Sequence, residues 1–146
     1  MEMKFSLRKG VYFIYMMYIR FFTALVTAAI LDGLWLGVIT KSLYQKMIGH
    51  VMADKVNFVA IALFYPLFTA TILFFVVNPA LKAGWSIWHV ALVGGFLGLA
   101  LYGTYDLTSQ AIIKNWPASI TIIDIAWGVV ITAAVSVVTV LVSRAL

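Results

Sequence analysis

The sequence contains no cysteine and very little charge. Without cysteine, the chain cannot form disulfides, thiolate metal centres or a thiol nucleophile. Charged residues make up only 10% of the 146 residues and hydrophobic residues 64%, whereas soluble domains carry about 25% charged and about 45–50% apolar residues. A soluble globule of this composition could not cover its core with polar surface. The composition therefore indicates a protein whose solvent is largely lipid.

Motifs typical of soluble enzymes are also missing. The sequence has no G-x-S-x-G, H-E-x-x-H or P-loop and no glycine-rich nucleotide loop, and nothing in it identifies a cofactor. His50 and Asp54 are four residues apart but lack further metal ligands, so we expect a solvated loop rather than a metal site. The net charge of +5 is placed at the ends of apolar runs. We therefore expect contacts with lipid headgroups and no nucleic acid.

Four apolar runs are each long enough to cross a bilayer, which takes about 20 helical residues. We predict an all-α polytopic membrane protein with four transmembrane helices in one small bundle, at about residues 21–39, 57–77, 87–109 and 118–142. Residues 1–20 are expected to form a basic, aromatic interfacial segment, and residues 21–146 the transmembrane domain. Residues 41–55 are expected to be a loop. Pro66 should kink the second span, and Asn78-Pro79 should end it.

The basic residues give an orientation. Four spans place both termini on one side, and that side has more Lys and Arg than the other, which favours both termini in the cytoplasm of a plasma or inner membrane. The terminal side carries Lys4, Arg8, Lys9, Arg20, Lys82 and Arg144, and the opposite side carries Lys41, Lys46, Lys55 and Lys114.

Three carboxylates interrupt the apolar runs: Asp32, Asp106 and Asp124. An Asp at a helix centre costs about 2.5–3.5 kcal/mol to insert, and such residues face the interior of a bundle, a cavity or a partner. The first and third spans run in one direction and the fourth runs back. All three acids should therefore lie at similar depth on the side away from the termini. We expect them to converge in a polar pocket, or else to clamp neighbouring helices through buried hydrogen bonds.

Two of the acids belong to a repeated pattern. Asp32 and Trp35 in the first span, and Asp124 and Trp127 in the fourth, form Asp-x-x-Trp followed closely by glycine. A spacing of three residues places both side chains on one helix face, where the indole N–H can meet a polar partner while the ring packs. With hydroxyl groups nearby, the candidate ligand-binding residues are Asp32, Trp35, Tyr65, Tyr102, Tyr105, Asp106, Thr108, Asp124 and Trp127.

Several strings resemble one family. The stretches Leu31–Gly37, Gly49–Asp54 and Tyr102–Thr108, with Asn115-Trp116-Pro117, are similar to the predicted membrane proteins of the domain-of-unknown-function 2177 family. The resemblance extends from about Phe21 to the C-terminus and leaves the first twenty residues uncovered. It implies four spans in one small domain and no particular activity. Its pattern residues here are Asp32, Trp35, Tyr44, His50, Asp54, Tyr105, Asp106, Trp116, Pro117, Asp124 and Trp127.

Three functions fit these features. The first is an intramembrane Asp/Tyr/Trp pocket that binds or transports a small cation, a proton or a polar ligand. The second is a non-catalytic accessory subunit, in a homo-oligomer or a larger membrane complex. The third is a lipid-modifying membrane enzyme with an Asp as general acid or base. The third ranks last, because the sequence offers no recognisable nucleophile or metal set.

Overall fold

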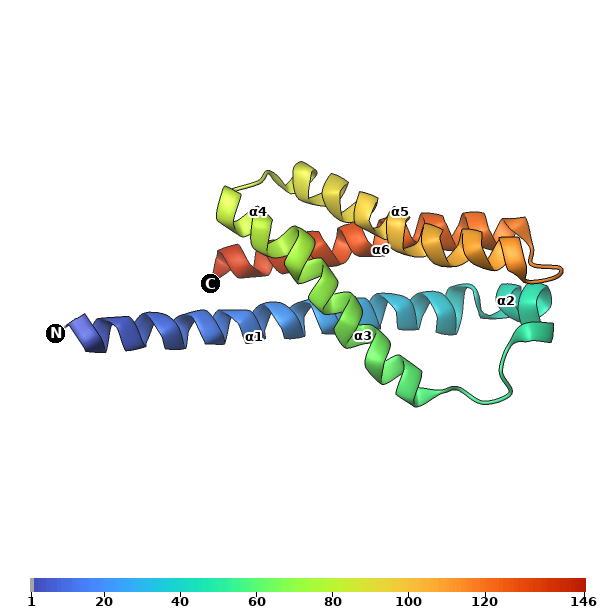
Figure 1. The fold of residues 1–146 in the computed structure, drawn as a ribbon, viewed down its shortest axis with the longest axis horizontal. Helices are drawn as coiled ribbons and strands as arrows, with labels where there is room; N and C mark the ends of the chain where they lie inside the picture. The colour runs from blue at the N-terminus through green and yellow to red at the C-terminus, as the bar shows by residue number, and fades with distance from the viewer. Residues whose placement is uncertain (1) are drawn as a thin grey trace.

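The protein is a bundle of four helical passes, with a longer connection after the first pass and short ones after the second and third (Figure 1). The computed structural model describes the backbone of residues 2–146 and the side chains of residues 10–146. Within the described residues there is no β-strand. Four helical stretches are long and apolar enough to cross a membrane: Gly10–Ile39, Phe58–Ala83, Ile87–Ile112 and Ala118–Ala145. The predicted all-α membrane fold with four spans is confirmed.

The first two passes each contain a π-helical turn. The first consists of α1 (Glu2–Leu34) and η1 (Trp35–Ile39), and the short helices α2 (Lys41–Ile48) and η2 (Gly49–Val51) follow it. The second consists of α3 (Phe58–Ile72), η3 (Leu73–Val77) and α4 (Asn78–Ala83). The third and fourth are the single helices α5 (Ile87–Ile112) and α6 (Ala118–Ala145). Both termini lie at the same end of the bundle, and α1 extends beyond it (Figure 1).

Side-chain caps fix the starts of two passes. The Asn57 side-chain oxygen accepts hydrogen bonds from the backbone N–H groups of Val59 and Ala60, each at 3.1 Å. The Ser86 hydroxyl accepts one from the His89 N–H at 3.2 Å. Each cap satisfies donors that have no partner within the helix. The predicted beginnings of the second and third spans agree with these positions.

Two local predictions were wrong. Asn78-Pro79 does not end the second pass, which continues to Ala83 and stops at Gly84 with φ 66°. The π-helical turn comes directly before, and Pro79 occupies the first turn of α4, where its missing N–H is not needed. Residues 41–55 are not all loop, because α2 forms within them and buries Tyr44. The helix α1 also runs unbroken through residues 2–20, and an interfacial position for that segment stays a prediction.

Glycines bring α5 and α6 into close contact. A Cβ on Gly98 would overlap the Gly128 carbonyl group, and one on Gly94 would lie 2.8 Å from the Ser136 hydroxyl oxygen. The Gly-x-x-x-Gly pair of α5 therefore faces α6, as this motif does in other membrane helices. The helix α1 also packs against α6, and its Ala24 and Ala28 are fully buried in the core.

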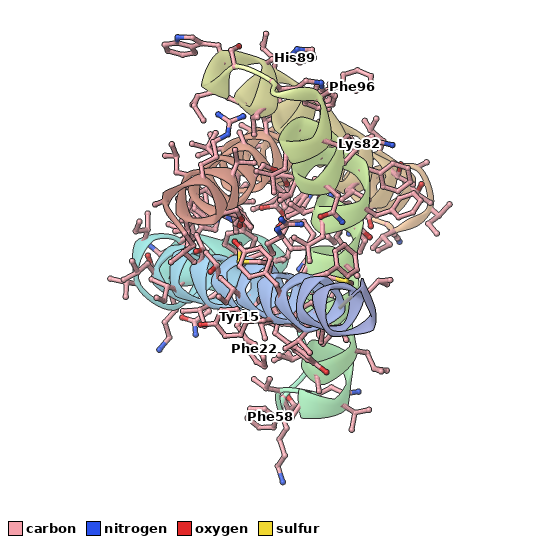
Figure 2. The ribbon with its side chains drawn as sticks, turned by 90° about the vertical axis from the view of Figure 1, so that its left-hand side faces the viewer. Tyr15, Phe22, Phe58, Lys82, His89 and Phe96 are labelled. Carbon is pink, nitrogen blue, oxygen red and sulfur yellow. The ribbon has the colours of Figure 1, made fainter. Side chains whose placement is uncertain are left out.

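The helix α3 crosses the bundle obliquely (Figure 1). Its second half packs into the core through Phe68 and Ile72. Its first turn, marked by Phe58, projects beyond α1 on the side away from α5 and α6 (Figure 2). A wedge therefore opens between α3 and α5, and this wedge borders the candidate site.

Candidate functional site

The two Asp-x-x-Trp segments contact each other through a hydrogen bond and a stacked pair of indole rings. The indole N–H of Trp127 on α6 donates a hydrogen bond of 2.9 Å to the Asp32 carboxylate on α1. One turn further along the first pass, the Trp35 ring stacks on the Trp127 ring with centroids 4.3 Å apart and planes 2° apart. The acid of the first segment thus binds the tryptophan of the second, which fastens α1 to α6. The sequence suggested that an indole meets a polar partner here, but not which one.

Two tyrosines complete the surroundings of Asp32. Tyr65 on α3 faces the same carboxyl group. Tyr102 on α5 lies within electrostatic range of both Asp32 and Asp106, and its ring rests on Gly128, where a Cβ would overlap it. Each of the four passes therefore contributes one side chain around Asp32, which is only 4% exposed. We call Asp32, Trp35, Tyr65, Tyr102 and Trp127 the central cluster.

Asp106 is in a different situation. It lies on α5 and is fully buried, and neither of its carboxylate oxygens has a hydrogen-bond partner among the described residues. A buried polar group without a partner costs free energy, and a charged one costs more. The structure therefore distinguishes two of the intramembrane acids by their partners: Asp32 accepts a hydrogen bond from an indole, and Asp106 has no hydrogen-bond partner among residues 10–146.

The close approach of α5 and α6 sets the levels of the acids. Because Gly98 lies against Gly128 and the helices are antiparallel, Asp106 falls at the level of Ile120, within about a turn. Asp124 lies one turn further from the non-terminal end of α6. Asp32 is hydrogen-bonded to Trp127, so it lies at the level of Trp127, further still. The distance from the level of Asp106 to that of Asp32 is thus seven residues of α6, or about 10 Å at about 1.5 Å per residue. The acids therefore lie at successive levels along the bundle, and their similar depth in the bilayer stays a prediction.

The remaining candidates lie at the edges of this region. Asp124 is half-buried and makes no hydrogen bond to any described side chain. Tyr105 is 62% exposed, and its ring makes an edge contact with Trp116 at 6.4 Å. Thr108 is exposed and lines a shallow groove on another side of α5. Tyr105 and Thr108 therefore lie outside the central cluster.

A cavity beside the site could not be predicted from the sequence. The wedge between α3 and α5 forms an apolar cavity of about 500 Å³, which Tyr102 and Tyr105 line together with Phe64, Phe68 and Thr71. Aromatic residues on lipid-facing helices carry no signal for such a cavity, because it depends on the crossing angle of α3.

The helix α6 also has a stripe of buried hydroxyl residues that is not among the candidates predicted from the sequence. Thr132, Ser136 and Thr139 are fully buried, and their spacing of four and three residues on one helix face was visible in the sequence. The hydroxyls of Ser136 and Thr139 donate to the carbonyls of Thr132 and Val135, each at 2.7 Å. The Thr132 hydroxyl has no partner among the described residues. The stripe adds polar groups to the helix that carries Asp124 and Trp127.

The candidate metal ligands stay apart from one another in the part of the chain that the structure describes. Across the described residues, no three His, Asp or Glu side chains gather in a way that could hold a metal ion. Each intramembrane acid therefore offers a single carboxyl group, with hydroxyl and indole neighbours.

Comparison with known proteins agrees with the fold. The family model described as predicted membrane protein, DUF2177, matches residues 11–141. The match begins ten residues before Phe21, so it includes half of the segment that the motifs had left uncovered. No curated protein and no solved structure matches the chain. Because the family model covers most of its length, this chain belongs to the DUF2177 family of predicted membrane proteins.

Proposed function

We propose that this integral membrane protein binds and releases a proton inside the bilayer, with Asp106 as the exchanging group. The observation that carries the proposal is that Asp106 is fully buried and that its carboxyl group has no hydrogen-bond partner in the part of the chain whose side chains are described. An ionisable side chain in a membrane span is costly to insert, and such residues mark ion, proton or substrate pathways. A lone carboxyl group with no gathered ligands suits a proton better than a metal ion, which needs several donors at once.

The levels of the other ionisable side chains suit a transfer path that starts at Asp106. Its level lies nearest the end opposite the termini, six residues before the end of α5. Asp124 and then the central cluster follow at successively deeper levels, and Tyr102 lies within electrostatic range of both Asp106 and Asp32. Carboxyl and phenol groups can each accept and donate a proton. In this proposal, Asp106 exchanges its proton with the non-terminal side, and Asp124 and Tyr102 extend the path inward.

Infrared difference spectroscopy tests the proposal. The wild-type protein in lipid would be titrated across the neutral pH range, and the carbonyl stretch of a protonated aspartic acid would be followed. We expect Asp106→Asn to remove this signal, because the variant keeps the shape and loses the titrating group. The matched control is Asp54→Asn, which changes an exposed aspartate between η2 and α3 and should leave the intramembrane signal in place.

Two results would count against the proposal. An unchanged difference spectrum in Asp106→Asn would show that this residue does not exchange the proton. A saturable stabilisation by Na⁺ or K⁺ that is lost in Asp106→Asn, without a titrating carbonyl band, would assign the site to a small cation instead. Elution as a single species and an unchanged helical circular dichroism spectrum would establish that the variant is folded.

A further inference from the structure

A second polar feature lies at the opposite end of the bundle from Asp106. There α1 meets α4, and the two helices enclose a groove of about 470 Å³. Figure 2 looks at this end of the molecule, where Lys82 on α4 and Tyr15 on α1 lie. The groove is lined by Phe13, Met17, Arg20, Asn78, Leu81 and Lys82. It shares no residue with the central cluster.

The lining carries positive charge without compensation. Arg20 and Lys82 are both cations, and no carboxylate is among the described residues that line the groove. The intramembrane acids Asp32 and Asp106 do not line it. Among the lining residues, an anion would therefore meet two positive charges and no carboxylate.

One hydrogen bond orients the Arg20 side chain and leaves other N–H donors of its guanidinium group unused within the described part of the chain. Its Nη1 donates a hydrogen bond of 3.3 Å to the side-chain oxygen of Asn78. Its Nε is buried and has no partner among the described residues. A guanidinium group has five N–H donors arranged for planar oxyanions. Asn78 thus orients the group, and the remaining donors can bind an anion.

The other lining residues favour a lipid as the source of that anion. Phe13, Met17 and Leu81 make an apolar wall beside the charged groups, which suits an acyl chain better than water. Tyr12, Tyr15 and Tyr18 are exposed on the same stretch of α1, as aromatic residues are at membrane interfaces. With the termini in the cytoplasm, as predicted, the groove opens into the leaflet where anionic lipids concentrate.

We propose that the groove between α1 and α4 binds the phosphate group of an anionic phospholipid, through Arg20 and Lys82. Asn78 acts as a positioning residue for the Arg20 guanidinium group. The acyl chain lies against the apolar wall. This site is independent of the proton exchange proposed above, so the failure of either leaves the other standing.

Native mass spectrometry of the full chain in detergent tests the site. Phosphatidylglycerol and phosphatidylcholine would be titrated separately onto the wild type, Arg20→Gln, Lys82→Gln and Lys114→Gln. We expect one phosphatidylglycerol bound in preference to phosphatidylcholine. Arg20→Gln should weaken this binding about tenfold or more, as for the loss of a charge-assisted hydrogen bond, and Lys82→Gln should weaken it less. Lys114→Gln removes an exposed charge at the other end and should change nothing.

A second variant and a second ligand complete the test. Arg20→Lys keeps the charge but loses the planar donors, so binding should fall between that of the wild type and of Arg20→Gln. Equal phosphatidylglycerol binding by Arg20→Gln and Lys114→Gln would overturn the proposal, as would equal binding of phosphatidylcholine and phosphatidylglycerol by the wild type. Inorganic phosphate alone should not raise the melting temperature. If it does so as strongly as phosphatidylglycerol, the site takes a free anion and the lipid assignment is wrong.

Discussion

The contrast between Asp32 and Asp106 predicts opposite effects on stability. Trp127→Phe removes the indole donor to Asp32 and keeps an aromatic ring to stack on Trp35. A buried hydrogen bond to a charged group contributes about 1.5–3 kcal/mol, and its loss also leaves the carboxyl group short of a partner. We therefore expect Trp127→Phe to lower the free energy of unfolding by about this amount.

Asp106→Ala should behave differently. The substitution removes a buried group that has no hydrogen-bond partner among the described residues and introduces the best helix former. Relief of an unsatisfied buried group is worth about 1–3 kcal/mol, and the small cavity left behind offsets part of it. We expect Asp106→Ala to be at least as stable as the wild type.

Both variants can be compared by equilibrium unfolding in mixed micelles, with melting temperatures in detergent as a second readout. Asp32→Asn serves as a control for Trp127→Phe, because the asparagine side-chain oxygen still accepts a hydrogen bond from Trp127. The free energy of unfolding should therefore fall less in Asp32→Asn than in Trp127→Phe. If Asp106→Ala destabilises the protein as much as Trp127→Phe does, Asp106 holds helices together and the reasoning behind the proton site fails.

Two further predictions concern the bundle itself. Gly98→Ala should cost about 1–3 kcal/mol through overpacking, since its Cβ would overlap the Gly128 carbonyl group, whereas Gly103→Ala, with nothing within 4 Å of the new Cβ, should be tolerated. Melting temperatures in detergent would check this pair, and equal losses would contradict the close approach of α5 and α6. Because the chain lacks cysteine, single cysteines can report topology. Ser143→Cys should react with a membrane-impermeant thiol reagent only from the cytoplasmic side, and Lys114→Cys only from the other. Labelling of both from one side would contradict four spans.

The four passes could be predicted from the sequence because length and apolarity alone decide them. Any helix of about 20 apolar residues spans the bilayer, whatever its neighbours. The internal details depend on packing. The end of the second pass was placed at Pro79, but a π-helical turn before it lets the helix continue to Ala83. No pattern in a single sequence marks such a turn.

The candidate site could be predicted only in part, because residue spacing gives the face of one helix but not its partner helix. The Asp-x-x-Trp spacing predicts that acid and indole share a face of each helix. It does not indicate that Asp32 pairs with Trp127 across the bundle, because that depends on how α1 and α6 rotate against each other. The different environments of Asp32 and Asp106 have the same origin: both are single acids in apolar runs, and only the packing of the four passes gives one of them a partner.

We propose that Asp106 exchanges a proton, whereas Asp32 fastens α1 to α6 through Trp127. The most direct test is infrared titration of Asp106→Asn and Asp32→Asn side by side, with isotope-labelled aspartate. The chain has only four aspartates, at positions 32, 54, 106 and 124, so the titrating bands can be assigned. We expect Asp106→Asn to lose the titrating carbonyl band and Asp32→Asn to retain it. Loss of the band in Asp32→Asn alone, with Asp106→Asn unchanged, would show that Asp32 and not Asp106 exchanges the proton.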